Sequence, residues 1–271
     1  MKVGRNEARE NGDVHRVRRL RVGEIEIDVV GFRTAVDVVV DLAKRGSGGY
    51  VVTPNIDHVV VAENNPDFKA AYAGAALSVV DGMPLVWASR LLGVPLPEKI
   101  SGSDLVLPLM ERAGQEGLRV YLLGAGPGIA AKAGEALNRR YGVNIVGAEG
   151  PMLTGAADDP QAAAAFERVR AAKPHLLLVG MGAPKQELLM YRFEKAYAPA
   201  VALGIGAAID FIAGTVKRAP PWMANNGLEW AYRLSREPKR LWRRYLVNDP
   251  KFLFILAKTM ARPKEERVAW R

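Results

Sequence analysis

The sequence predicts an α/β protein whose mainly parallel sheet is covered by helices on both faces and followed by a basic helical appendage. Short apolar runs alternate with longer segments of helical character, which is the pattern of a parallel sheet with crossover helices. Most of these runs end in a turn rich in glycine, proline, asparagine or aspartate. Positive charge is concentrated at the end of the chain, where residues 217–271, here called the basic tail, contain 14 Lys and Arg against 5 Asp and Glu.

The elements follow in order along the chain. Residues 24–30 read as a first strand or hairpin, and the glycine cluster at residues 46–49 ends the first helix. Further strands are predicted at residues 50–53, 77–80, 119–123, 144–147, 175–179 and 200–204. Helices are predicted at residues 35–44, 57–63, 67–76, 83–92, 129–141, 161–172 and 185–195. The expected organisation is a flexible basic leader at residues 1–21, a sheet domain at residues 22–215 and the appendage at residues 216–271.

Composition excludes several classes of protein. No apolar run reaches the roughly 18–20 residues that cross a bilayer, and the polar N-terminal segment is not that of a secretory signal peptide. The chain has no cysteine, so disulfides and thiolate metal sites are excluded and a cytoplasmic location fits. The net charge of +9 comes from the basic tail, which also holds four of the five tryptophans. This combination favours binding to an anionic surface, although a solvated helix that packs its tryptophans on the body remains an alternative.

The strand-end turns predict a ligand crevice. They lie at residues 53–55, 81–82, 124–128, 180–184 and 204–206. Ligands of open parallel sheets bind at the carboxyl ends of the strands, and helices that start there favour a phosphate group.

A glycine-rich turn follows the strand at residues 119–123. Gly124 and Gly126 match a dinucleotide fingerprint, but Ile129 stands at the third glycine position and Asn144 stands where an acidic ribose ligand is expected. A turn that includes Gly128 and contacts a nucleotide diphosphate is therefore favoured over an NAD site. A tight turn without a ligand is the alternative.

Asp81 directly follows a strand and is a candidate general base, or alternatively the cap of the next helix. Thr53 and Asn55 flank Pro54, which fixes the backbone, so both side chains are candidate ligands of sugar hydroxyls. His58, one helical turn later, is read as structural, and a histidine metal site is not expected.

The run at residues 180–187 combines a strand end, a glycine turn and a helix start. Its candidate ligands are Gly182, Pro184, Lys185, Gln186 and Glu187, although Glu187 also suits a helix-dipole partner. Gly206 and Asp210 repeat the arrangement at the next strand end.

The chain contains no Asp-x-Asp triplet, so a leaving diphosphate needs cations from elsewhere. Guanidinium groups bind phosphate in a bidentate manner. The candidates in the basic tail are Arg218, Arg233, Arg236, Arg240, Arg243 and Arg244.

Six motifs follow one another along the chain: Thr53-Pro-Asn, Asp81-Gly-Met-Pro, Gly102-Ser-Asp, Leu123-Gly-Ala-Gly-Pro-Gly, Gly182-Ala-Pro-Lys-Gln-Glu, and Arg218-Ala-Pro with the later Gly-Leu-Glu-Trp-Ala-Tyr-Arg-Leu and Glu-Pro-Lys-Arg-Leu. Their order and spacing over residues 22–257 resemble the WecG/TagA/CpsF glycosyltransferase family. The resemblance implies a Rossmann-like catalytic domain whose appendage closes over the site and approaches the membrane. It also implies peripheral association with the cytoplasmic face of the plasma membrane.

The implied reaction transfers a sugar of the N-acetylmannosamine, mannosaminuronate or glucose type from a UDP-sugar. The acceptor is a polyprenyl-diphosphate-linked saccharide of cell-surface polysaccharide synthesis, and the anomeric carbon is inverted without a metal or other cofactor. By resemblance, Asp81 is the base that deprotonates the acceptor hydroxyl, and Thr53, Asn55 and Gln186 line the sugar and acceptor pocket. The appendage stabilises the leaving UDP through Arg233, Arg240 and Arg243.

Two other functions compete with this reading. The glycine turn suggests a dinucleotide-dependent oxidoreductase, and the basic tail suggests a nucleic-acid-binding protein. The tail intersperses its charges with Trp, Leu and Tyr, which favours anionic lipid over nucleic acid. Its partly amphipathic residues 228–246 leave open a role in homo-oligomer formation.

Overall fold

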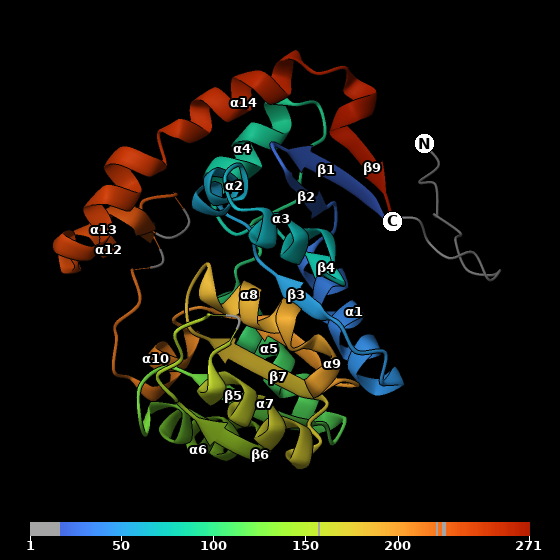
Figure 1. Ribbon diagram of the computed structural model, residues 1–271, viewed down its shortest axis with the longest axis vertical. Coiled ribbons are helices and arrows are strands. Elements are labelled where there is room, and N and C mark those ends of the chain that lie inside the picture. The colour runs from blue at the N-terminus through green and yellow to red at the C-terminus, as the bar shows by residue number, and fades with distance from the viewer. Residues whose placement is uncertain (1–16, 157, 221, 224–225) are drawn as a thin grey trace, which may run out of the picture.

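The computed structural model describes residues 17–156, 158–220, 222–223 and 226–271 (Figure 1). Most of the predicted leader, residues 1–21, lies outside the described residues. Strand β1 (Arg18–Val22) nevertheless begins before the boundary that was predicted at residue 22.

The described residues form a six-stranded parallel sheet in the order β4-β3-β8-β7-β5-β6, which confirms the predicted fold class (Figure 1). From β3 the chain moves to the edge strand β4, crosses to β5 and β6 at the other edge, and returns to the centre with β7 and β8. The strands are β3 (Tyr50–Val52), β4 (Leu77–Ser78), β5 (Arg119–Gly124), β6 (Asn144–Glu149), β7 (Leu176–Gly180) and β8 (Val201–Gly204).

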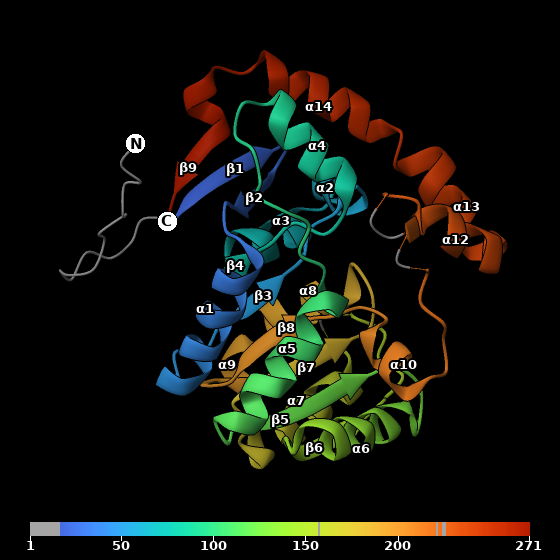
Figure 2. The same cartoon turned by 180° about the vertical axis from the view of Figure 1, so that it is seen from behind.

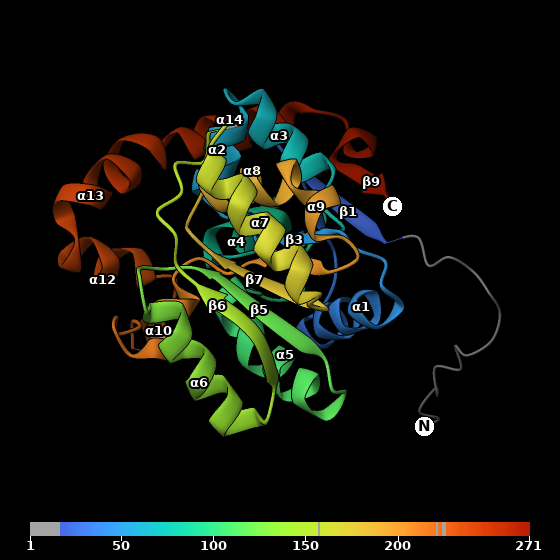
Figure 3. The same cartoon turned by 60° about the horizontal axis from the view of Figure 1, so that its bottom comes forward.

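Each face of the sheet is packed under helices (Figures 1 and 3). Leu176 and Leu178 of β7 belong to one hydrophobic core, whereas Leu177 and Val179 belong to the other. Because neither face meets water, the central strands are apolar throughout. The helices of the first core are α1 (Phe32–Arg45), α5 (Gly102–Gln115), α6 (Ile129–Tyr141) and α10 (Ala208–Ala213). Those of the second are α2 (Ile56–Ala62), α3 (Pro66–Ala73), α4 (Met83–Leu91), α7 (Pro160–Ala172), α8 (Lys185–Arg192) and α9 (Glu194–Tyr197).

A three-stranded antiparallel sheet connects the two ends of the described chain. Strand β1 pairs with β2 (Ile25–Asp28) on one side and with β9 (Val268–Trp270) on the other (Figure 2). Arg19 contacts Glu26 and Asp28 at 2.7 and 2.9 Å. The basic residues at 18–21 thus belong to a strand, and part of their charge is paired across the hairpin.

The basic tail passes over α2 and α4 before it reaches this small sheet (Figures 1 and 2). Its elements are α12 (Glu229–Arg236), α13 (Pro238–Arg243), the π-helix η1 (Arg244–Asn248), α14 (Lys251–Ala261), the 3₁₀ helix η2 (Lys264–Arg267) and β9. Phe252 and Ile255 of α14 are buried in the second core, and the guanidinium group of Arg271 donates to the carbonyls of Ala75 and Ala76. The predicted appendage is therefore attached to the body at its far end as well as at its start.

None of the helices described is both long enough and apolar enough to cross a bilayer.

Candidate active site

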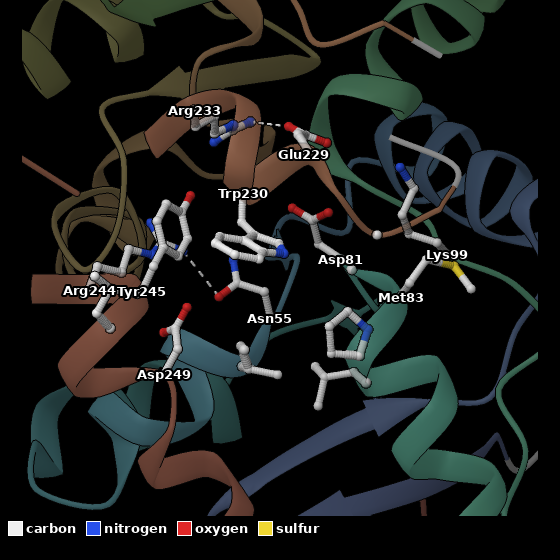
Figure 4. A pocket seen from close by; sticks show the side chains of 16 residues that line it. Asn55, Asp81, Met83, Lys99, Glu229, Trp230, Arg233, Arg244, Tyr245 and Asp249 are labelled. Atoms are coloured by element: carbon white, nitrogen blue, oxygen red, sulfur yellow. Dashed lines mark hydrogen bonds and ion pairs between the residues drawn. The ribbon is translucent and has the colours of Figure 1, made fainter. Parts of the chain in front are cut away.

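A pocket of about 250 Å³ lies where the ends of β3 and β4 face the basic tail (Figure 4). The body contributes the loops that follow the two strands and the start of α4, and the tail contributes α12 and η1. Both carboxylates and cations line the pocket, and Trp230 and Tyr245 provide aromatic surface. The charged lining residues are Asp81, Lys99, Glu229, Arg233, Arg244 and Asp249.

Asp81 lies three residues beyond β4, which ends at Ser78 and is shorter than the predicted strand, and its backbone N–H donates to the carbonyl of Pro54 at 2.7 Å. Gly82 follows with a φ of 121°, a conformation that favours glycine, and it is the N-cap of α4. No side chain caps this helix, so the alternative role of Asp81 as its cap is wrong.

The pKa of Asp81 is raised to about 7, first by burial and second by the negative charge of Glu229. Arg233 and Lys99 act in the opposite direction. A carboxylate with a pKa near neutrality can accept a proton during catalysis and is still ionised in part at physiological pH.

Asn55 caps α2, where its side-chain oxygen accepts a hydrogen bond from the N–H of His58 at 3.3 Å. The same oxygen accepts from the guanidinium of Arg244 at 3.4 Å. Asn55 lines the pocket, whereas the predicted ligand Thr53 is buried and does not. His58 is structural, since its ring bonds to the Tyr72 hydroxyl at 2.7 Å and burial lowers its pKa to about 3.

The basic tail supplies two of the cations. Arg233 forms an ion pair of 2.5 Å with Glu229, one turn earlier on α12. Arg244 of η1 contacts Asp57 of α2 at 3.2 Å, which fastens the tail to the body beside the pocket. The third cation of the pocket is Lys99, which belongs to the body and contacts Asp104 at 3.3 Å.

Other predicted arginines lie elsewhere in this structure. Arg218 pairs with Asp104 at 2.5 Å and lines a second cavity between α5, α6 and α10. Arg240 pairs with Glu237 at 2.6 Å, and the guanidinium of Arg243 lies 5.4 Å from the ring of Trp242. Neither Arg240 nor Arg243 lines the pocket.

Gln186 and Glu187 are predicted ligands whose side chains are buried, Gln186 against the turn that follows the central strand β8. Gln186 donates to Glu187 at 2.8 Å and accepts from the N–H of Gly206 at 3.1 Å. Burial raises the pKa of Glu187 to about 7. Gln186 thus holds the turn after β8, Glu187 accepts its amide N–H, and neither side chain lines the pocket.

The glycine turns lie at the carboxyl ends of β5, β7 and β8, outside this pocket. An added Cβ at Gly124 would meet the carbonyl oxygen of Gly180 at 2.3 Å, so this glycine is required by strand packing whether or not a ligand binds. Lys185 donates to the carbonyl of Leu153, and Asp210 accepts from Thr215. Gly126, Gly128, Gly182 and Pro184 remain predicted nucleotide contacts.

Residues 20–266 match the family model described as "Glycosyl transferase WecG/TagA/CpsF family". The chain belongs to this family. Members of the WecG/TagA/CpsF family are glycosyltransferases of cell-surface polysaccharide synthesis, so the chain is a glycosyltransferase. The assignment favours sugar transfer over dinucleotide oxidation and nucleic-acid binding.

The pocket of this family member therefore contains the predicted Asp81, Asn55 and Arg233. It also contains Lys99, Glu229, Trp230, Tyr245 and Asp249, which the sequence analysis did not single out, and Arg244, which it named only among six arginines. A signal existed for Glu229 and Trp230, because both lie within the Gly-Leu-Glu-Trp motif. Lys99 lies outside the quoted motifs, three residues before Gly102-Ser-Asp.

Proposed function

We propose that this glycosyltransferase moves a sugar from a UDP-sugar to a polyprenyl-diphosphate-linked saccharide with inversion at the anomeric carbon. One observation carries the proposal: Asp81, with a pKa near 7, shares a pocket with the cations Lys99, Arg233 and Arg244. A direct displacement needs a base at the acceptor hydroxyl and positive charge at the leaving diphosphate. Membership of the family supports a sugar nucleotide and a lipid-linked glycan as substrates.

In this reaction Asp81 takes the proton of the acceptor hydroxyl as its oxygen attacks the anomeric carbon. The bond between that carbon and the β-phosphate oxygen breaks, and UDP leaves with the electron pair. Lys99, Arg233 and Arg244 stabilise the negative charge of the diphosphate, a role that this proposal gives to side chains and not to a metal ion. A single displacement of this kind inverts the anomeric carbon.

The pocket is too small for a complete UDP-sugar, so we place the sugar and the nucleotide in two different regions. Pockets for complete drug-sized ligands have volumes of roughly 300–1,000 Å³, so about 250 Å³ suits the sugar region only. In this proposal the nucleotide extends toward the glycine turns, where Gly128 and Gly182 border open space that a phosphate can enter. The donor sugar is of the N-acetylmannosamine, mannosaminuronate or glucose type.

The outer face of the basic tail supports membrane association. Leu253 and Phe254 of α14 are 69% and 76% exposed, and Leu246 and Val247 of η1 are exposed nearby. We call these four residues the apolar tail face. Exposed lysines at 251 and 258 accompany it, and this pairing of apolar and basic side chains favours the surface of an anionic bilayer. The proposal places the enzyme at the cytoplasmic face of the plasma membrane, where lipid-linked acceptors lie.

The test is release of UDP from a panel of UDP-sugars with a short-chain lipid-diphosphate saccharide as acceptor. Asp81→Asn is expected to lower turnover by about 100-fold or more while UDP binding is kept. The control is Asp41→Asn on the exposed face of α1, which should leave turnover unchanged. Full turnover by Asp81→Asn would contradict the role of the base, and absence of UDP release from every donor would contradict the reaction.

A further inference from the structure

Trp230 lines the pocket, and the reaction proposed above gives its aromatic side chain no role. It lies in the first turn of α12, next to Glu229 and close to Arg233 (Figure 4). Its ring centroid lies 5.9 Å from that of Tyr245, in a tilted arrangement that orients the indole. The residue remains 42% exposed even though it lines a pocket. A large apolar surface is thus presented to whatever enters the pocket.

The neighbours of Trp230 determine which ligand suits this surface. Asn55 and Asp81 line the same pocket and offer planar groups that accept or donate hydrogen bonds. A pyranose ring has an apolar face of C–H groups and an equatorial belt of hydroxyls. An aromatic face bordered by amide, carboxylate and guanidinium groups matches both parts of such a ring.

We propose that Trp230 is the stacking platform for the acceptor sugar, an inference that rests on the proposed function. Asp81 takes its proton from the acceptor hydroxyl, so the ring nearest to Asp81 belongs to the acceptor. The limited volume of the pocket leaves the uridine outside it. Trp230 therefore contributes to the choice of acceptor, while the strand-end turns of the body bind the nucleotide.

The basic tail supplies one side of this acceptor site. Trp230 and Tyr245 belong to α12 and η1, whereas Asp81 and Asn55 belong to the body. The acceptor site is complete only when the tail lies over the ends of β3 and β4. The tail also supplies Arg233 and Arg244 to the diphosphate, but in the proposed function the nucleotide has further contacts at the strand-end turns of the body. Acceptor affinity therefore depends on the tail more strongly than donor affinity does.

The experiment compares Trp230→Ala, Trp230→Phe and the control Trp242→Ala, whose tryptophan is equally exposed on α13 but lies outside the pocket. Initial rates give the KM for the lipid-diphosphate saccharide acceptor and for the UDP-sugar, and calorimetry gives the Kd for UDP. Trp230→Ala is expected to raise the acceptor KM about tenfold or more, with the donor KM and the Kd for UDP unchanged. Trp230→Phe should restore most of the affinity, and Trp242→Ala should behave as the wild type.

Two results would overturn the proposal. A weaker Kd for UDP with an unchanged acceptor KM would mean that the indole stacks on uracil. A Trp230→Phe variant as defective as Trp230→Ala, with an unchanged melting temperature, would mean that no aromatic platform is needed. Wild-type turnover is measured first, so that failure of the proposed reaction is recognised separately. If the wild type shows no turnover, the Kd of a soluble saccharide-diphosphate is measured by equilibrium binding for the wild type and for Trp230→Ala. Equal Kd values would contradict the role of Trp230 as a stacking platform.

Discussion

Asp81 lies between charges of opposite sign, and their balance sets the pH at which it can accept a proton. Burial and Glu229 raise its pKa, whereas Arg233 and Lys99 lower it, with a net value of about 7. A general base must be ionised in the free enzyme, so kcat/KM is expected to fall as the pH drops below this value. The acidic limb of the pH profile therefore reports the charges around the pocket.

Glu229→Gln tests this balance. Removing the negative charge takes away a contribution that raises the pKa of Asp81, and it also releases Arg233 from its ion pair, which lowers that pKa further. The acidic limb of kcat/KM is therefore expected to move to lower pH, by about 0.5–1 pH unit. Steady-state rates between pH 5 and 9 measure the shift.

Glu237→Gln is the matched control, because Glu237 follows the same helix and pairs with the exposed Arg240. In Glu237→Gln the acidic limb of kcat/KM should lie at the same pH as in the wild type. A shift to higher pH in Glu229→Gln, or an equal shift in both variants, would contradict the account of Asp81.

At the scale of residues, the sequence predicts that Asp81 and Asn55 meet in one crevice, because residues that follow neighbouring parallel strands converge at one edge of the sheet. Both residues line the pocket. Sequence reasoning could not place Gln186, since position in a first helical turn does not fix the direction of the side chain. In the structure Gln186 is bonded inward to Gly206, and this bond depends on the packing of β8 against α8. Lys99 was missed because its approach to the pocket depends on Ile100, whose N–H donates to the carbonyl of Val80.

The π-helix η1 determines which tail arginine faces the body. Arg243 ends α13 and extends over Trp242, whereas its neighbour Arg244 begins η1 and contacts Asp57 and Asn55. A π-turn changes the angular register of a helix, so a regular helical pattern does not predict this division. Asp57 is 14% exposed and Arg244 is 30% exposed at their side chains, so the pair is partly shielded from solvent.

Arg244→Met is expected to loosen η1 and α14 locally. Burial raises the pKa of Asp57 and Arg244 lowers it, so loss of the cation leaves a half-buried carboxylate without a partner. The cost should be about 1–3 kcal/mol, and it should decrease at low pH, where Asp57 becomes protonated. Hydrogen exchange of residues 244–256 should quicken, while exchange in β5 and β7 should not change.

The controls are Arg243→Met and Asp57→Asn. Arg243 is exposed, so its loss should leave the exchange of η1 as it is in the wild type. Asp57→Asn removes the unpaired charge, so the double variant with Arg244→Met should exchange more slowly than Arg244→Met alone. Equal protection of η1 in all variants would show that this ion pair does not hold the tail.

At the scale of elements, the strands of the large sheet were predictable because most are short apolar runs that end in a turn. The edge strand β6 is less apolar and is partly exposed along its length. Helix α5 was not predicted, and Pro108 in its interior is a signal that usually ends a helix. Buried contacts of Leu105, Leu109 and Met110 with the sheet outweigh that signal. Strand β9 was also missed, because a three-residue strand depends on its partner β1 and has little pattern of its own.

At the scale of the whole molecule, the basic tail encloses the pocket and is attached to the body at both of its ends. The basic tail leaves the body after α10, crosses the pocket with α12 and η1, packs α14 against the core and ends on β1. A chain cut near Thr215 would lose α14 and β9, which cover apolar residues of the body, together with the arginines. Single substitutions in the tail are therefore needed to separate binding from folding.

Membrane association is tested on the apolar tail face with the double variant Leu253→Glu, Phe254→Glu. Both side chains point away from the body, so the fold and the turnover of a water-soluble, short-chain acceptor should be kept. Burial of a Leu or Phe side chain contributes roughly 1.5–3 kcal/mol, so affinity for anionic vesicles is expected to fall by about 100-fold or more. Sedimentation with phosphatidylglycerol vesicles measures this affinity.

The control is Met152→Glu, which places one of the two added charges on an equally exposed apolar residue of the body. It should bind vesicles as the wild type does. With an acceptor embedded in vesicles, the double variant should lose turnover in proportion to its lost binding, because the tail that carries the apolar tail face also lines the pocket with α12 and η1. Unchanged sedimentation of the double variant would show that the enzyme reaches its acceptor through another surface.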